Sequence, residues 1–122
     1  MQDYRNLHVW QKLTNLALAT YAVSAYLHKP EGWPLRDQLF RAAISIPSNI
    51  AEGSGYGLNK RYVHHLRIAR GSEAELQTQL ELAARLGYAT GEQVRPLHAK
   101  ASEVGRMLNG LIKSLSPLVP DP

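Results

Sequence analysis

The sequence predicts an all-α protein, folded as an antiparallel up-down four-helix bundle. Apolar residues recur three and four positions apart over four long segments, and no segment shows the strict alternation of a β-strand. The connections between these segments are short and contain Gly and Pro. Long helices with short connections favour antiparallel neighbours, and 122 residues suffice for one domain with one core.

The first helix is expected from about Leu7 to Leu27, because apolar and small residues recur at helical spacing along it. Pro30 and Gly32 predict a loop after this helix. Pro34 then suits the first turn of the second helix, where its missing N–H would have no helical partner in any case.

The second helix is apolar on two sides. A surface helix of a monomer needs only one apolar face, so the second face predicts burial on both sides or contact with another subunit. Pro47 is expected to kink the helix and Gly53 to end it in a left-handed conformation. The core-facing side comprises Leu35, Leu39, Ala42, Ala43, Ile46 and Ile50. The second side, predicted as the subunit interface, comprises Phe40, Ile44, Pro47 and Ala51.

The third helix is expected to begin after Asn59 and to end at Gly87. Thr90 and Gln93 have the spacing of a capping box at the start of the fourth helix. The bundle is expected to occupy residues 1–115, and the proline-rich residues 116–122 to form a disordered or frayed tail. The buried sides are Tyr62, Leu66, Ala69, Leu76, Leu80 and Ala83 in the third helix, and Val94, Leu97, Ala101, Val104, Leu108, Leu111 and Leu115 in the fourth.

Four residues inside these helices need a special explanation. Gly71, Gly105 and Gly110 each lower helix stability by about 1 kcal/mol relative to Ala. We expect these glycines because they allow neighbouring helices to approach closely. Glu73 falls within the apolar arc of the third helix, where a buried acid needs a charged or hydrogen-bonding partner. A structural polar contact, across helices or subunits, is favoured for Glu73 over an acid–base role.

Positive charge is concentrated in one part of the chain, which has a net charge of +4. Residues 34–70 contain six Lys or Arg residues but only two acids, Asp37 and Glu52. A local basic field suggests a polyanionic partner, although a merely solvated face is the alternative. The candidate phosphate-binding residues are Arg36, Arg41, Lys60, Arg61, Arg67 and Arg70.

Other kinds of site find little support. The chain has no Cys, which excludes disulfides and thiolate chemistry and fits a cytoplasmic location. His64 and His65 are adjacent rather than four residues apart, so they do not form a helical metal site, and no serine has the context of an activated nucleophile. We therefore expect no enzyme activity, metal or cofactor. No apolar run approaches the length of a membrane span, and no signal peptide is expected.

The segment at 38–53, QLFRAAISIPSNIAEG, resembles the bacterial four-helix-bundle family encoded in ribosomal RNA intervening sequences. That family also includes the accessory variability proteins of diversity-generating retroelements. Further similar blocks lie at 7–12, 66–80, 86–88 and 104–115. Relatives usually carry two adjacent basic residues where this chain has Phe40 and Arg41. In the motif, Asn49 and Glu52 form a polar cluster with an expected structural role.

The resemblance implies a ring-like homopentamer, and its retroelement members act with a reverse transcriptase. Together with the basic segment, this predicts a non-enzymatic homo-oligomer that binds RNA, DNA or a nucleoprotein through phosphate contacts. The alternative is a structural or protein-interaction module that binds no nucleic acid.

Overall fold

The computed structural model describes residues 3–25, 27, 30–55 and 60–116, and over these residues it is helical without any strand. The four helices are α1 (His8–Ser24), α2 (Trp33–Ser54), α3 (Lys60–Arg85) and α4 (Gly91–Leu115). Two single-turn 3₁₀ helices, η1 (Tyr4–Asn6) and η2 (Pro30–Gly32), precede α1 and α2. The all-α, four-helix prediction is confirmed.

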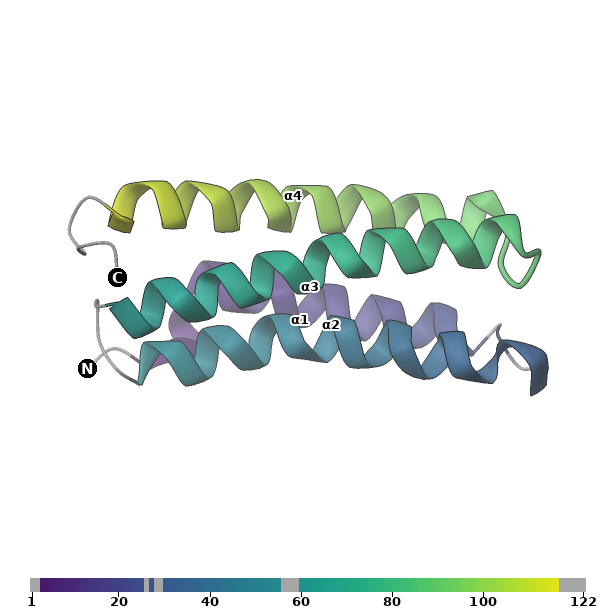
Figure 1. The fold of residues 1–122 in the computed structure, drawn as a ribbon, viewed down its shortest axis with the longest axis horizontal. Helices are drawn as coiled ribbons and strands as arrows, with labels where there is room; N and C mark the ends of the chain where they lie inside the picture. Colours follow the sequence, from purple (N-terminus) through teal and green to yellow (C-terminus); the bar gives the residue numbers. More distant parts are fainter. Residues whose placement is uncertain (1–2, 26, 28–29, 56–59, 117–122) are drawn as a thin grey trace.

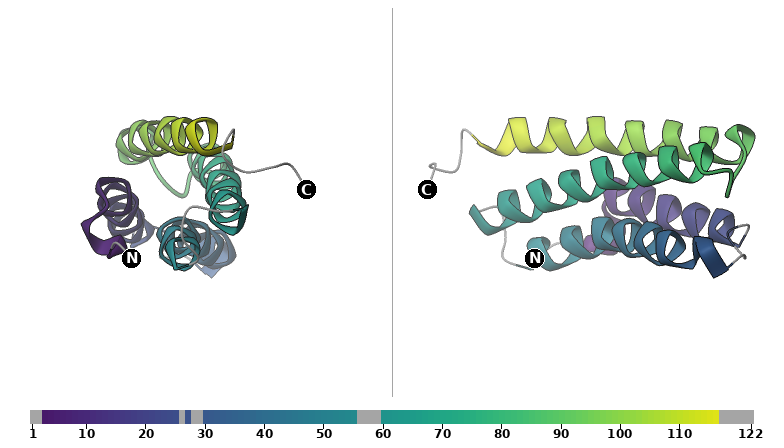
Figure 2. Two further views of the ribbon diagram at one scale, coloured as in Figure 1. Left: turned by 90° about the vertical axis from the view of Figure 1, so that its left-hand side faces the viewer. Right: turned by 45° about the vertical axis from the view of Figure 1, so that its right-hand side comes forward.

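The helices alternate in direction along one long axis, so that each runs antiparallel to the next (Figure 1). Contacts join α1 to α2, α2 to α3, α3 to α4, and α4 back to α1. Viewed end-on, the helices occupy the four corners of a bundle (Figure 2). The pair α1 and α2 therefore forms one side of the bundle, and the pair α3 and α4 forms the opposite side.

The core fills the space between the four helices. Five of the six core-facing residues predicted for α2 are buried, and Leu35 is half-buried against them. The predicted sides of α3 and α4 are also buried, except that Leu111 and Leu115 near the end of α4 are only half-buried. The spacing of apolar residues thus predicts which face of these helices turns inward, because that burial is the main stabilising term.

Three predicted helix ends are confirmed. Thr90 accepts a hydrogen bond from the Gln93 N–H at 3.1 Å, and the Gln93 side chain accepts one from the Thr90 N–H at 2.8 Å, which completes the capping box. Gly87, two residues after α3, has φ +79°, the left-handed conformation that glycine tolerates best. Pro34 lies in the first turn of α2.

The predicted end of the second helix is wrong. Gly53 lies inside α2, which passes through Pro47 and continues to Ser54. Gly53 is present for a different reason: a Cβ at this position would lie 2.7 Å from Cβ of His65 on α3. The missing side chain therefore lets α2 and α3 approach closely. The bend predicted at Pro47 stays a prediction.

Close helix approach explains only one of the three glycines for which it was predicted. A Cβ on Gly105 would lie 2.9 Å from Oε2 of Glu73, so α4 is close to α3 at this position. Within the single chain the prediction is wrong for Gly71 and Gly110, because an added Cβ would meet nothing within 4 Å there.

Some expected boundaries differ or cannot be compared. The first helix ends at Ser24, three residues earlier than expected, although Leu27 beyond it is still buried. The expected cap at Asn59 and the tail from residue 117 onward lie outside the described residues. Among the helices of the described chain, none has the apolar length that crossing a bilayer requires.

Replacement of Gly53 and Gly71 by alanine should have opposite effects. We expect Gly53→Ala to lower the free energy of unfolding by about 1–3 kcal/mol, because the new methyl group collides with His65 at its root. Gly71→Ala adds a methyl group in open space, so it should raise stability by about 0.5–1 kcal/mol. Urea unfolding followed by circular dichroism measures both. Equal effects of the two substitutions would contradict the close packing at Gly53.

Candidate nucleic-acid interface

The first half of α3 carries the largest group of predicted phosphate-binding residues. Lys60, Arg61, Arg67 and Arg70 are all exposed. No acidic residue occurs between Lys60 and Ser72, so no carboxylate within this half-helix offsets their charge. In the described part of the chain, Lys60, Arg67 and Arg70 form no ion pair. These side chains are therefore available to an external anion.

Arg36 and Arg41 lie elsewhere. The contact between the Ser45 and Ser72 hydroxyl oxygens, at 2.9 Å, fixes the register of the antiparallel helices α2 and α3. Because Arg36 and Arg41 precede Ser45 on α2, they lie level with the second half of α3, away from Lys60. The structure thus divides the six candidate cations between the two halves of the bundle.

Arg36 is also engaged within the chain. Its Nε lies 3.6 Å from Oδ1 of Asp37, and its guanidinium lies 5.5 Å from the centre of the Trp33 ring. The Asp37 carboxylate offsets part of the Arg36 charge, and both contacts compete with a phosphate for the guanidinium. Arg41 is exposed and, within the described residues, has no ion pair.

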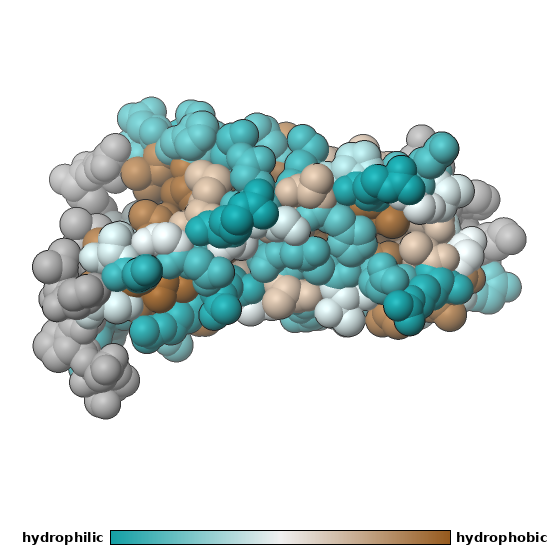
Figure 3. All heavy atoms as spheres, turned by 90° about the horizontal axis from the view of Figure 1, so that it is seen from above, coloured by the Kyte–Doolittle hydropathy of each residue, from teal (hydrophilic) through white to brown (hydrophobic). Residues whose placement is uncertain are grey.

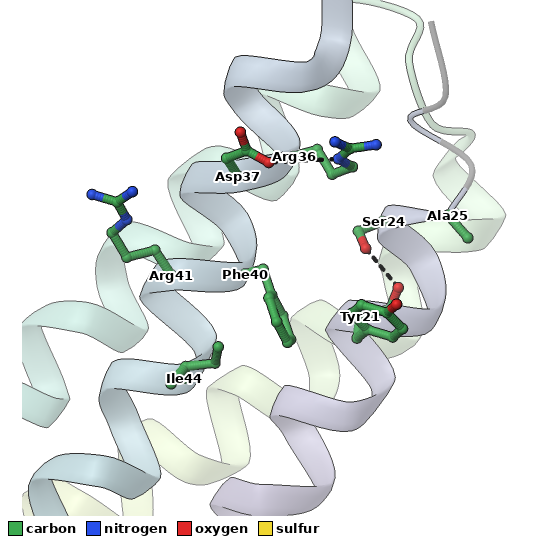
Figure 4. A pocket seen from close by; sticks show the side chains of 8 residues that line it. All are labelled: Tyr21, Ser24, Ala25, Arg36, Asp37, Phe40, Arg41 and Ile44. Atoms are coloured by element: carbon green, nitrogen blue, oxygen red, sulfur yellow. Dashed lines mark hydrogen bonds and ion pairs between the residues drawn. The ribbon is translucent and has the colours of Figure 1, made fainter.

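A groove of about 690 Å³ opens between α1 and α2 (Figure 4). Tyr21 of α1 and Phe40 of α2 face each other across it, with ring centres 5.0 Å apart. Arg36 extends across one end of the groove, whereas Arg41 points away from Tyr21. The complete lining is Tyr21, Ser24, Ala25, Arg36, Asp37, Phe40, Arg41 and Ile44.

The second apolar side of α2 borders this groove and stays accessible to solvent. Ile44 is 42% exposed, and Phe40, Pro47 and Ala51 are half-buried. Across the groove, Tyr21 is 61% exposed. None of these residues lies in the core of the single chain, so the surface is open to a partner.

Asn49 belongs to a polar network between α2 and α3. Its side-chain N–H donates to the carbonyl oxygen of Ser45 at 2.7 Å, and its Oδ1 lies 2.9 Å from Nδ1 of His65. Ser45 in turn contacts Ser72. Ser45 and Asn49 of the SIPSN segment thus link the two helices. Glu52, predicted to share this cluster, is exposed and has no ion pair among the described residues.

Glu73 lies in the interface between α3 and α4 and is only 6% exposed. The Gln77 side chain donates a hydrogen bond to Oε1 of Glu73 at 2.5 Å and reaches Ser102 Oγ of α4 at 3.4 Å. Nδ1 of His98 lies 3.2 Å from Oε1 of Gln77. A buried carboxyl with this hydrogen-bonded surrounding contributes to the packing of the two helices and is closed to substrate.

Two cations of α4 extend the basic surface, and the sequence did not assign them. Arg106 and Lys113 are exposed and form no ion pair within the described residues. The contact between Gln77 and Ser102 places this half of α4 beside the first half of α3. After Glu103, α4 contains no acid. The sequence alone shows that this part of α4 contains no acid. Only the antiparallel pairing of the helices shows that it lies beside the acid-free half of α3.

The last acid of α4 is neutralised from another helix. Oε1 of Glu103 lies 3.0 Å from Nζ of Lys12 on α1. This hydrogen-bonded pair lowers the pKa of the Glu103 carboxyl below its ordinary value. Glu103 thus pairs with Lys12 of α1, and the nearby charge of Arg106 lowers its pKa further. Within the described residues, no group of three or more His, Asp or Glu side chains could hold a metal ion.

Comparison with known proteins identifies the family. The family model described as 23S rRNA-intervening sequence protein matches residues 5–110. The chain belongs to this family. A search of curated proteins gives no match. A crystal structure from Bacteroides thetaiotaomicron VPI-5482, described as a protein of unknown function from the S23 ribosomal protein family, is similar in fold, with a TM-score of 0.80 and 25% sequence identity. The similarity covers 86% of this chain and 98% of that chain.

The match to the 23S rRNA-intervening sequence protein family includes most of the structural elements described above. The matched range includes α1, α2, α3, the groove and Arg106, and it ends three residues before Lys113. The family match therefore spans the elements that form the bundle, except the last residues of α4.

Replacement of Asn49 tests the polar network at the α2–α3 contact. Asn49→Ala removes one hydrogen-bond partner of His65 and the side-chain donor to the Ser45 carbonyl, so we expect the free energy of unfolding to fall by about 1–2 kcal/mol. Ser48→Ala, at an exposed neighbouring position on the same helix, should change it by less than about 0.5 kcal/mol. If chemical unfolding gives the same stability for the two variants, the network does not link the helices as described.

Proposed function

We propose that this chain is a non-enzymatic, basic homo-oligomer that binds RNA or DNA, alone or in a nucleoprotein, through the phosphate backbone. The observation that carries the proposal is the first half of α3. Its four exposed cations occur with no acid among them, and three of the four have no ion pair in the described residues. Such a surface attracts polyanions without reading bases.

The proposed oligomer uses the second apolar side of α2. Phe40, Ile44, Pro47 and Ala51 leave part of their apolar surface in solvent, and Tyr21 adds an exposed aromatic ring from α1. Burial of this surface against another copy would remove it from water. A ring-like homopentamer, which the family resemblance implies, would repeat the net charge of +4 in every subunit.

The competing function is a structural or protein-interaction module. The groove between α1 and α2 favours it, because an accessible apolar surface suits a protein partner as well as another copy. In that case the cations of α3 would only be solvated. A reverse transcriptase is one nucleoprotein partner to test if its gene lies nearby.

Binding to nucleic acid should weaken steeply as salt rises. Fluorescence anisotropy with labelled RNA and DNA of 20–30 nucleotides, titrated at several salt concentrations, gives the dependence of the binding constant on salt. We expect a negative slope on logarithmic axes, of about 0.7–0.9 for each phosphate contacted. If micromolar protein retains neither polymer at low salt, the nucleic-acid function is wrong and the interaction-module function is favoured.

A charge placed on the proposed subunit interface should dissociate the oligomer. We expect Ile44→Asp to reduce the mass measured by light scattering to that of one chain, because a carboxylate cannot be buried there without a partner. Leu82→Asp is the matched control, since Leu82 of α3 is 45% exposed and lies outside the groove. A wild-type chain that is already monomeric, or an Ile44→Asp chain of unchanged mass, would contradict this interface.

A further inference from the structure

The geometry points to the seam between α3 and α4 as a binding surface for the backbone of double-stranded nucleic acid. This inference rests on the proposed function and assigns it to one surface. The seam combines cations of two adjacent helices, and these cations are far apart in the sequence. It comprises Lys60, Arg67 and Arg70 of α3 with Arg106 and Lys113 of α4.

The side chains of α3 reach the seam by helical periodicity. Gln77 faces α4, because it contacts both Ser102 and His98. Arg70 precedes Gln77 by seven residues, nearly two turns, and so lies on the same side of α3. Arg67 and Lys60 precede Arg70 by three and ten residues, so they lie about 60° and 80° around the helix from it, on its exposed outer side.

The same reasoning places the cations of α4. Ser102 faces α3, and Arg106 and Lys113 follow it by about one and three turns. At 1.5 Å per residue, Arg106 and Lys113 are about 10 Å apart along the axis. Because α4 runs antiparallel to α3, these two residues lie level with the first half of α3. Arg70, Arg106 and Lys113 therefore border the line where α3 and α4 meet, and Arg67 and Lys60 continue the positive charge on the outer side of α3.

No carboxylate lies within the two helical segments that carry these cations. Residues 60–72 and 104–116 contain no Asp or Glu. Of the acids that border the two segments, Glu73 is buried beneath the seam, and Glu103 pairs mainly with Lys12 of α1 and more weakly with Arg106. The seam thus carries positive charge with no acid inside either segment, which suits the repeating charge of a phosphate backbone.

The seam stays open when copies of the chain associate through α1 and α2. The groove lies between α1 and α2, and the seam lies on the opposite side of the bundle (Figure 2). Seen from the α4 side, hydrophilic side chains extend along the molecule, with hydrophobic ones visible between them (Figure 3). Each subunit of the proposed oligomer can therefore present one seam to the same nucleic acid, which increases avidity.

The chemistry of the seam favours a duplex over a single strand. Proteins that hold single strands commonly stack bases on aromatic side chains. In residues 60–72 and 104–116 the one Phe, Tyr or Trp is Tyr62, which is buried. The seam offers cations without a stacking surface, so it matches a ligand whose bases are already paired and whose phosphates face outward.

A comparison of two double variants tests the inference. Arg106→Gln with Lys113→Gln removes two charges from the seam, whereas Arg36→Gln with Arg41→Gln removes two charges from the other half of the bundle. Anisotropy titrations with a 20-base-pair duplex of RNA, one of DNA, and a single strand of each give the affinities and their salt dependence. Light scattering and thermal unfolding establish that each variant keeps the fold and the oligomer of the wild type.

We expect the seam variant to bind either duplex about tenfold more weakly and to lose about two units of salt slope, while the Arg36 and Arg41 variant stays close to wild type. Equal losses of duplex affinity in the two variants, or a larger loss in the Arg36 and Arg41 variant, would show that the seam is not the binding surface. The proposed function would still stand. Tighter binding of single strands than of duplexes would overturn the choice of ligand. Failure of the wild type to bind any of them would instead overturn the proposed function.

Discussion

The arrangement of charge depends on the contact between Glu73 of α3 and Gly105 of α4. A buried carboxyl of α3 rests against a position of α4 that has no side chain, and a Cβ there would lie 2.9 Å from Oε2. A buried acid tolerates few registers, because its oxygens must keep their hydrogen bonds. Gln77 supplies that bond and also reaches Ser102. The register fixed in this way brings the acid-free half of α4 beside the acid-free half of α3.

The bundle divides two kinds of surface between opposite sides. The α1–α2 side has a groove with exposed apolar groups, including Tyr21 and Ile44, and the α3–α4 side has unpaired cations. Apolar surface favours association with protein, and uncompensated positive charge favours association with phosphates. Because the two surfaces do not overlap, the proposed oligomer and the proposed nucleic-acid binding are compatible. Arg36 and Arg41 lie on the groove side, and Arg36 already contacts Asp37 and Trp33.

The sequence predicts much of the fold because periodicity and capping are local properties. The buried faces of α3 and α4, the Thr90 capping box and the left-handed Gly87 all follow from neighbouring residues. The role of Gly53 does not, because His65, which makes glycine necessary, belongs to another helix. For the same reason the sequence suggests one group of six candidate cations, and this group does not include Arg106. Only the pairing of antiparallel helices separates Arg36 from Lys60 and adds Arg106 and Lys113.

Acetylation of lysines in the unaltered protein, with and without a duplex, tests the central claim most directly. Mass spectrometry of the digested chain reports the extent of modification at each lysine. Lys60 and Lys113 lie at the seam, whereas Lys12 pairs with Glu103 and Lys100 precedes the acid-free half of α4. We expect the duplex to protect Lys60 and Lys113 severalfold and to leave Lys12 and Lys100 unchanged. Equal protection of all four lysines, or protection of Lys12 and Lys100 alone, would contradict a phosphate-binding surface between α3 and α4.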